Sequence, residues 1–502
     1  MSRFEGTPLA PLAGRIAGFA IDHRAVAPGY VFGAFRGARF DGETVIGEAV
    51  ARGAIAVVAG PDARVEGALH VAADDPRAAF AALAARFHAP YPSVAVAVTG
   101  TNGKTSTVEL LRELWHMAGH RAASMGTLGV AAAGDRAAAG RGGLTSPDIV
   151  TFLATAAGLA REGVTHLAFE ASSHGLDQHR VDGVPLAAAG FTNLSRDHLD
   201  YHGTMEAYFE AKLRLFTELL PEGAPAVVWR DEASASAPWT RRLCAAAEAR
   251  GRRVETVGPA GTLLRLVSRH PTRLGQELVV EAAGATHRVG LPLIGAYQAA
   301  NALLAAGLAI ATGGDPAASL AGLARVVGVR GRLERACLTR TGAPVYVDYA
   351  HTPDALAEAL AALRPHAAGR LILVFGCGGD RDRGKRPEMG RVAAAAADLA
   401  VVTDDNPRSE EPAAVRADVL TGAPGRLVEV AGRRAAIAAA LAEAGPGDVV
   451  LIAGKGHEQG QDIGGTVLPF DDVEVAREEA ARLAAGAEGG AAGARPAFGA
   501  GT

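Results

Sequence analysis

Residues 94–106 read VAVAVTGTNGKTS, and this stretch says more about fold and chemistry than any other part of the sequence. Its first five residues are small and apolar, which is typical of a buried strand. A glycine turn follows, and Lys104 and Thr105 then lead into a segment whose Leu110 and Leu114 share one helical face. A strand, a tight glycine turn and a helix in this order can cradle the phosphates of a nucleotide. Backbone N–H groups face the anion, Lys104 adds a positive charge, and Thr105 offers a hydroxyl to Mg²⁺.

The spacing of this loop narrows the type of phosphate site. The general phosphate-loop pattern has a glycine six residues before the lysine, where this chain has Val98. The shorter form Gly-Thr-Asn-Gly-Lys-Thr resembles the ATP loop of the Mur ligase family, the peptide-adding enzymes of bacterial cell-wall synthesis. The resemblance implies ATP binding by Gly100, Thr101, Asn102, Gly103, Lys104, Thr105 and Ser106.

Length and composition limit the classes of protein to consider. The chain has 502 residues, which predicts three domains at about 150 residues each. A net charge of −4 argues against a general nucleic-acid surface, and three scattered cysteines form neither a disulfide framework nor a metal-ligand spacing. We find no bilayer-length apolar run and no signal-peptide core, and we therefore expect a cytoplasmic monomer without membrane insertion.

The alternation of strands and helices predicts an α/β fold with three domains. Residues 1–88 read as a small N-terminal α/β domain, which the family resemblance makes the UDP-substrate domain. Residues 89–327 read as a central ATP-binding domain with a mostly parallel sheet, and residues 328–485 as a Rossmann-like C-terminal domain that binds the amino acid. Residues 486–502 are rich in Gly and Ala and predict a disordered tail.

Three residues beyond the glycine loop resemble metal-site positions of the family. Glu170 follows an apolar strand, where a carboxylate could bind Mg²⁺. Considered without the other residues, it would be interpreted as an ordinary exposed glutamate. By composition alone, residues 192–203 read as a turn with a helix cap, and Lys212 reads as a surface lysine. The resemblance implies instead that Thr105, Glu170, His198 and Lys212 hold Mg²⁺, with Lys212 converted by CO₂ to a carbamate, N6-carboxylysine.

Three polar loops follow strands of the C-terminal domain, at residues 376–387, 403–408 and 454–458. Individually they read as a nucleotide loop, a solvated turn and a glycine turn, but the dense Arg and Lys content of the first suits carboxylates. Together they resemble the amino-acid pocket of the family members that add meso-diaminopimelate. This amino acid has a second carboxylate that lysine lacks, and Arg408 can bind it with two hydrogen bonds. The resemblance implies contacts from Arg381, Asp405, Asn406, Pro407, Arg408, Gly454 and Glu458.

The remaining family positions fall in all three predicted domains. Asn301 matches an adenine-contacting position, with Gln298 in place of a second Asn, and Arg332 and Asp348 match residues that reach the nucleotide. The N-terminal domain departs from the family pattern, because His23 stands where a Ser usually contacts the uridine nucleotide. The resemblance implies that UDP-MurNAc-L-Ala-D-Glu contacts His23, Thr145, Ser146, Ser172, Gln178 and Arg180.

The resemblance implies an ATP-dependent amide ligase that works through an acyl phosphate, with domain closure at hinges near Pro90 and Gly328 excluding water. Its catalytic group would be Lys104, Glu170, His198, Lys212 and Arg332. Two alternatives stay open, namely a related ligase with another amine substrate and a non-ligating ATP-binding regulator. A dinucleotide oxidoreductase is disfavoured, because no strand turn carries Gly-x-Gly-x-x-Gly.

Overall fold

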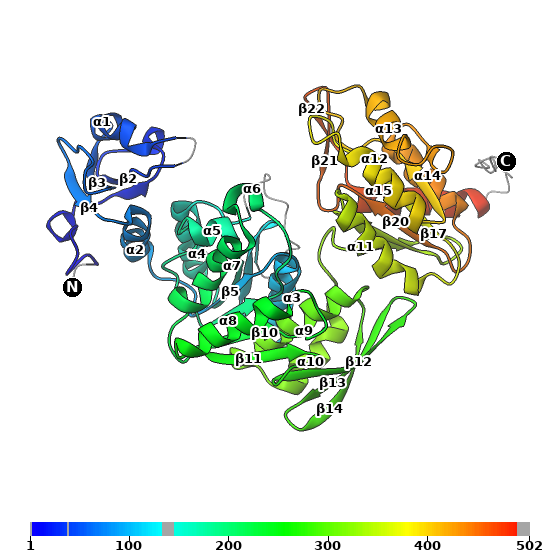
Figure 1. Cartoon of the computed structure of the whole chain (residues 1–502), viewed down its shortest axis with the longest axis horizontal. Coiled ribbons are helices and arrows are strands. Elements are labelled where there is room, and N and C mark those ends of the chain that lie inside the picture. The colour runs from blue at the N-terminus through cyan, green and yellow to red at the C-terminus, as the bar shows by residue number, and fades with distance from the viewer. Residues whose placement is uncertain (1–2, 38–39, 133–144, 489–502) are drawn as a thin grey trace. The chain divides into compact units, whose positions relative to one another are not determined.

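The computed structural model describes residues 3–37, 40–132 and 145–488, and Figure 1 labels its helices and strands. The contacts between residues divide the chain into two compact units. The first unit comprises Met1–Arg265 and Leu303–Ser319, and the second comprises Leu266–Ala302 and Leu320–Thr502. None of the described helices has the length and apolar character needed to cross a membrane. The predicted tail begins inside the last helix, which ends at Glu488, and residues 489–502 lie outside the described residues.

The N-terminal part of the first unit is a four-stranded parallel sheet in the order β1-β2-β3-β4. Its elements are β1 (Gly18–Ala20), β2 (Tyr30–Gly33), α1 (Ile46–Ala51), β3 (Ala54–Ala59), β4 (Leu69–Ala72) and α2 (Pro76–His88). Asp75 caps α2 by accepting a hydrogen bond from Ala78 N at 2.9 Å, with Pro76 in the first turn. This helix and the four strands give the N-terminal region the α/β character predicted for it.

The larger sheet of the first unit has β5 near its centre. Within this unit the order is β11-β10-β9-β5-β8-β6-β7, parallel except for the β6–β7 pair. The strands are β5 (Val94–Thr99), β6 (Ala122–Gly126), β7 (Gly129–Ala131), β8 (His166–Glu170), β9 (Ala188–Phe191), β10 (Pro225–Trp229) and β11 (Arg253–Gly258). The helices are α3 (Lys104–Met117), α4 (Ile149–Arg161), α5 (Ser173–Asp177), α6 (Leu199–His202), α7 (Met205–Arg214) and α8 (Ala237–Ala249).

The register of this sheet brings three chain segments to one edge. Val98 pairs with Glu170, and Thr99 pairs with Phe191, so β5, β8 and β9 end side by side. The glycine loop after β5 consequently lies between the end of β8 and the segment that follows β9. Parallel α/β sheets bind ligands at this carboxyl edge.

Several elements connect the large sheet to the rest of the chain. They are β12 (Leu264–Thr272), β13 (Gly275–Ala282), β14 (Ala285–Leu291), α9 (Ala296–Ala311) and α10 (Pro316–Gly322). Strands β13 and β14 form an antiparallel hairpin of the second unit.

The second unit contains a six-stranded sheet in the order β15-β16-β20-β17-β18-β19, parallel except for the edge strand β15. Its strands are β15 (Glu334–Leu338), β16 (Pro344–Asp348), β17 (Leu371–Phe375), β18 (Leu399–Val402), β19 (Val428–Glu429) and β20 (Val449–Ala453), and a separate hairpin pairs β21 (Gly460–Ile463) with β22 (Thr466–Pro469). The helices are α11 (Pro353–Leu363), α12 (Lys385–Ala396), α13 (Pro412–Leu420), α14 (Arg433–Glu443) and α15 (Asp472–Glu488).

Alternate residues of β17 face opposite layers of this sheet. Leu373 and Phe375 pack with α11, α12 and α13, whereas Ile372 and Val374 pack with α14 and α15. A strand buried on both faces is continuously apolar, and β17 accordingly reads Leu-Ile-Leu-Val-Phe. The predicted α/β class is confirmed, and the boundaries of the three predicted domains stay a prediction.

Candidate active site

The glycine loop after β5 depends on two glycines. Gly100 has a φ of +142°, and a Cβ placed on it would lie 1.9 Å from the Thr192 hydroxyl oxygen. Gly103 has a φ of +87° and precedes the first residue of α3. Lys104 folds back over the loop, and its Nζ donates to the carbonyl oxygens of Gly100 at 3.0 Å and Thr101 at 2.8 Å. The ammonium and the α3 N-terminus therefore present positive charge at the mouth of the loop.

Glu170 is a buried carboxylate that collects hydroxyl and amide donors. Its Oε1 accepts hydrogen bonds from Thr105 Oγ1 at 3.0 Å and Thr127 N at 2.7 Å, and its Oε2 accepts one from Thr127 Oγ1 at 3.2 Å. Its side chain approaches Gly126 so closely that a Cβ there would lie 2.1 Å from Oε1. The predicted pair Thr105 and Glu170 is thus brought together as two hard oxygen donors. The sequence reasoning missed Thr127.

Lys212 is buried, with 1% of its surface exposed, so the alternative reading of a surface lysine is wrong. Its Nζ donates to Gly100 O at 2.7 Å and lies 4.4 Å from the centre of the Tyr208 ring. Loss of solvation, followed by repulsion from Lys104, holds the pKa of Lys212 well below its ordinary value, and Asp197 only partly opposes this. The environment therefore favours a neutral amine.

His198 is partly exposed, whereas Glu170 and Lys212 are buried. Its φ is +52°, its backbone N donates to Asp197 Oδ1 at 2.8 Å, and 45% of its side chain is exposed. Its ring centre is 5.0 Å from that of His174. Over the described parts of the chain, no three His, Cys, Asp or Glu side chains gather in a way that could hold a metal ion. The predicted four-residue metal group stays a prediction.

Four of the residues predicted for the muramoyl dipeptide are in mutual contact. Ser146 Oγ accepts hydrogen bonds from Ser172 N at 3.1 Å and Ser172 Oγ at 3.0 Å. Arg180 donates to Gln178 Oε1 at 2.5 Å and to Ser146 O at 3.4 Å, and burial lowers the pKa of the Arg180 guanidinium. Tyr201, which sequence reasoning missed, accepts from Gln178 Nε2 at 2.8 Å.

The other two predicted residues have different partners. The Thr145 and Thr127 hydroxyl oxygens lie 3.1 Å apart, beside Glu170. His23 lies in a short 3₁₀ turn of the N-terminal sheet region, with its Nε2 3.4 Å from Glu48 Oε2.

The predicted nucleotide residues of the second unit are joined through Gln298. Its Nε2 donates to Arg332 O at 2.9 Å, and its Oε1 accepts from Asn301 Nδ2 at 3.4 Å. Gln298 therefore supports both flanking residues, a role the sequence did not indicate. Asp348 is buried and accepts hydrogen bonds from two backbone amides; burial raises the pKa of its carboxyl, while Arg332 opposes the shift.

Register places the three polar loops of the second unit along one edge. Asp348 pairs with Ala453, and Phe375 pairs with Val402, so the loops after β16, β20, β17 and β18 are neighbours. A Cβ on Gly454 would lie 2.4 Å from Asp405 Oδ2, so these two loops meet in close contact.

A buried lysine joins the loop after β20 to the loop after β18. Lys455 is fully buried, and its Nζ donates to Asn406 Oδ1 at 2.9 Å and Glu458 Oε2 at 3.1 Å. Asn406 Nδ2 also donates to Glu458 Oε2, at 2.8 Å. Asn406 and Glu458 are thus oriented before any ligand arrives. Arg381, in contrast, makes no hydrogen bond or ion pair with any of the described residues, and its charge is open to an anion.

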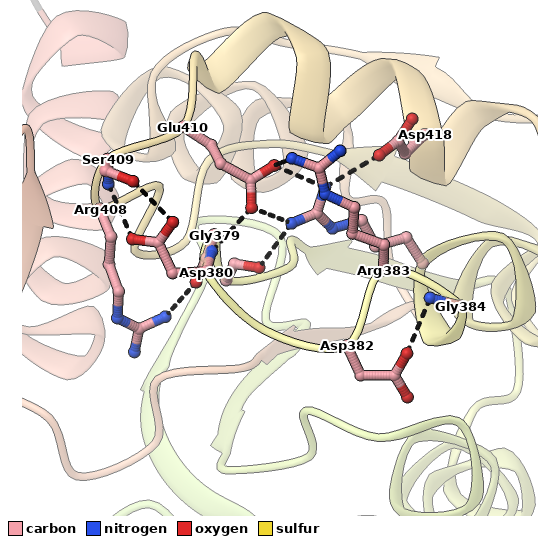
Figure 2. A network of polar contacts seen from close by, with 11 residues as sticks. Gly379, Asp380, Asp382, Arg383, Gly384, Arg408, Ser409, Glu410 and Asp418 are labelled. Carbon is pink, nitrogen blue, oxygen red and sulfur yellow. Dashed lines mark hydrogen bonds and ion pairs between the residues drawn. The ribbon is translucent and has the colours of Figure 1, made fainter.

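Figure 2 shows how the loop after β17 is tied to the loop after β18. Arg408 Nη1 donates to Gly379 O at 2.7 Å, and Ser409 donates to Asp380 through both its backbone N and its hydroxyl. Glu410 accepts hydrogen bonds from the fully buried Arg386, a side chain that also reaches Asp418. The predicted residue Arg408 is therefore held by hydrogen bonds between the loops after β17 and β18.

Comparison with known proteins identifies the family to which these loops belong. Residues 98–309 match the family model described as the Mur ligase middle domain, and residues 331–456 match the Mur ligase glutamate ligase domain. A UDP-N-acetylmuramoyl-L-alanyl-D-glutamate–2,6-diaminopimelate ligase from Zymomonas mobilis is 54% identical, over 92% of this chain and 94% of that protein. A protein of the same name from Caulobacter vibrioides is 53% identical, over 91% and 94%.

Solved structures agree with the sequence matches. A structure titled as the same diaminopimelate ligase aligns with a TM-score of 0.71 and 34% identity, covering 93% of this chain and 95% of its own. The MurF ligase from Thermotoga maritima, solved in complex with ADP, aligns with a TM-score of 0.56 over 93% of this chain and 98% of its own. At 19% identity, the second match speaks for the fold alone.

Proposed function

The chain belongs to the Mur ligase family, and from that premise we infer that it joins 2,6-diaminopimelate to UDP-MurNAc-L-Ala-D-Glu with hydrolysis of ATP to ADP and phosphate. The observation that carries this conclusion is the identity of about half of all residues, over nine-tenths of the chain, with proteins of that name. The reaction belongs to the synthesis of peptidoglycan precursors, and we propose that it takes place in the cytoplasm.

The reaction divides into two steps. A carboxylate oxygen of the D-Glu residue attacks the γ-phosphorus of ATP, ADP leaves, and an acyl phosphate remains. The amine of diaminopimelate then attacks the acyl carbon, loses a proton and expels phosphate, so that an amide forms. Phosphoryl transfer depends mainly on positioning and charge neutralisation, which the glycine loop and Lys104 supply at the triphosphate. In the second unit, Asn301, Arg332 and Asp348 are proposed to contact the nucleotide.

The donor set around Glu170 fits a hard cation. Thr105 Oγ1 and the Glu170 carboxylate are oxygen donors 3.0 Å apart at the edge of the glycine loop, and Mg²⁺ prefers such ligands. We propose that these two residues, His198 and a carbamate on Lys212 would hold Mg²⁺. When bound, the ion supplies charge neutralisation at the ATP phosphates.

Lys212 has the chemistry needed for a carbamate. Its buried amine is held toward the neutral form, and a neutral amine is the species that adds to CO₂. The nitrogen forms a bond to the carbon, an electron pair of one C=O bond moves to oxygen, and the amine loses a proton. Only four lysines, Lys104, Lys212, Lys385 and Lys455, occur among 50 Lys and Arg residues. A guanidinium does not lose its proton in proteins, so arginine cannot replace Lys212 in this role.

The loops of the second unit provide complementary charges for a diamino dicarboxylic acid. We propose that Arg381 and Arg408 bind carboxylates and that Glu458 binds an ammonium group. Asn406 is oriented by Lys455 and adds a polar contact. L-Lysine lacks the carboxylate proposed for Arg408, which is the physical basis for rejecting it.

Phosphate release tests the assigned reaction. The enzyme is incubated with ATP, Mg²⁺ and UDP-MurNAc-L-Ala-D-Glu, with meso-diaminopimelate, L-lysine or no amino acid added. We expect sustained phosphate release with meso-diaminopimelate and little with the other two. A related ligase with another amine substrate would respond to a different amino acid, and a non-ligating regulator would respond to none.

The role of Lys212 is tested separately. We expect Lys212→Ala to abolish ligation and short carboxylates such as acetate to restore part of it. Chemical trapping of the carbamate followed by mass spectrometry should label Lys212 and leave the half-buried Lys385 unlabelled, as an internal control. Full activity of Lys212→Ala without added carboxylate contradicts the assignment.

A further inference from the structure

Arg408 has a backbone conformation that arginine rarely adopts. Its φ is +52°, in the left-handed region, which is unfavourable for residues with a Cβ. The β21 segment stabilises it from one side, because Arg408 N donates to Asp462 O at 3.0 Å and Gly464 N donates to Arg408 O at 2.7 Å. Such a conformation persists only where the surrounding contacts impose it.

Asp380 supplies the contacts on the other side. It also has a φ of +52°, and its carboxylate accepts from Ser409 N at 3.1 Å and Ser409 Oγ at 2.6 Å. The preceding residue, Gly379, accepts from Arg408 Nη1 at 2.7 Å. The dipeptide Gly379–Asp380 thus binds both the side chain of Arg408 and the backbone that follows it (Figure 2).

A second hydrogen bond links Asp380 to the residues that follow Arg408. Asp380 N donates to Glu410 Oε1 at 2.7 Å, so Asp380 is bonded to both residues that follow Arg408. Glu410 is itself fixed by Arg386, whose guanidinium donates to it at 2.7 and 3.1 Å and is fully buried. The Ser409 hydroxyl and backbone amide lower the pKa of Asp380, which keeps its carboxylate ionised and able to accept both bonds.

We propose that Asp380 is a positioning residue for substrate selection, which directs the Arg408 guanidinium toward the second carboxylate of diaminopimelate without touching the substrate itself. The proposal rests on the function assigned above to Arg408. A frame of fixed hydrogen bonds lowers the conformational freedom that Arg408 would otherwise lose on binding. Discrimination between diaminopimelate and L-lysine should therefore depend on the carboxylate of Asp380.

Asp380→Asn is the sharpest variant, because asparagine tolerates the left-handed conformation while its amide offers only one acceptor oxygen to Ser409. Ser409→Ala removes the hydroxyl donor and leaves Asp380 intact. Asp382→Asn is the matched control, since Asp382 lies in the same loop but bonds Gly384 N, at 2.8 Å. Each variant is assayed by phosphate release, with KM and kcat measured for meso-diaminopimelate, L-lysine and ATP, and folding is checked by circular dichroism.

For Asp380→Asn and Ser409→Ala we expect the KM for meso-diaminopimelate to rise about fivefold to tenfold. The kcat, the KM for ATP and any turnover of L-lysine should stay as in the unaltered enzyme, and Asp382→Asn should match it throughout. Parallel changes for both amino acids, or an equal effect of Asp382→Asn, would overturn the proposal. If Asp380→Asn does not fold, Ser409→Ala decides alone. Failure of the unaltered enzyme to use meso-diaminopimelate would instead refute the proposed function.

Discussion

The buried ion pair between Arg433 and Asp472 allows a quantitative test of how the second unit supports its loops. Both side chains are fully buried, and Arg433 donates to Asp472 Oδ1 and Oδ2 at 2.7 Å each. Arg433 also donates to Ala453 O at 2.9 Å and Asp404 O at 3.3 Å. These two carbonyls directly precede Gly454 and Asp405, so one guanidinium bonds the backbone of two of the polar loops.

The magnitudes follow from what each substitution leaves behind. Arg433→Met leaves a buried carboxylate without its cation, and Asp472→Leu leaves a buried guanidinium that cannot lose its proton. Each should lower the free energy of unfolding by about 3–5 kcal/mol. The double variant removes both charges and leaves the carbonyls of Asp404 and Ala453 without their donor, which costs about 1–3 kcal/mol. The double variant should therefore be more stable than either single variant.

The assay must report on the second unit. All three tryptophans, Trp115, Trp229 and Trp239, belong to the first unit, so tryptophan fluorescence does not report on this one. Amide hydrogen exchange of β17 and β20, which are central strands, measures the free energy of opening. The reasoning fails if the effects of the single substitutions simply add in the double variant, that is, if the coupling energy is under about 0.5 kcal/mol.

Three further outcomes follow from the described contacts. Arg408→Ala should raise the KM for meso-diaminopimelate by about 10- to 100-fold, because hydrogen bonds to a charged group are lost, and it should leave the KM for ATP unchanged. Equal effects on both KM values in steady-state kinetics contradict the role assigned to Arg408. Arg386 lowers the pKa of Glu410 to about 2. Because the pKa of Glu410 is lower in the folded state than in the unfolded state, the ionised carboxylate stabilises the folded state fully above about pH 4.5, and this contribution is lost as the pH falls toward 2. Glu410→Gln should therefore make the stability, followed by circular dichroism, depend less on pH in that window. Thr105→Val removes the hydroxyl bonded to Glu170 and should raise the Mg²⁺ concentration for half-maximal phosphate release, and an unchanged Mg²⁺ titration would exclude Thr105 as a ligand.

Much of the site was predictable because its signals are local. The apolar run of β5, the positive φ of Gly103 and the helix after Lys104 all depend on residues within a few positions of one another. The same holds for β17, whose five residues form an uninterrupted apolar run.

The sequence could not indicate the partners that lie far apart in the chain. Thr127 is 43 residues from Glu170, and Gln298 is 34 residues from Arg332, and neither has a distinctive local pattern. The burial of Lys212 was equally hidden, because an amphipathic helix does not reveal which of its polar residues faces a loop more than 100 residues away.

Local sequence was enough to predict strands, turns and the types of chemical group present, since backbone conformation and hydrophobic periodicity are set by near neighbours. Which of those groups meet depends on how the strands are arranged in the folded chain. In the sheet, β20 lies between β16 and β17, out of its order in the chain, and this brings the loop of Lys455 to Asn406. Asp380 meets Ser409 because β17 and β18 are neighbours in the sheet. The physical reason is that sheet order results from burying both faces of all the strands at once, a property that no single segment carries.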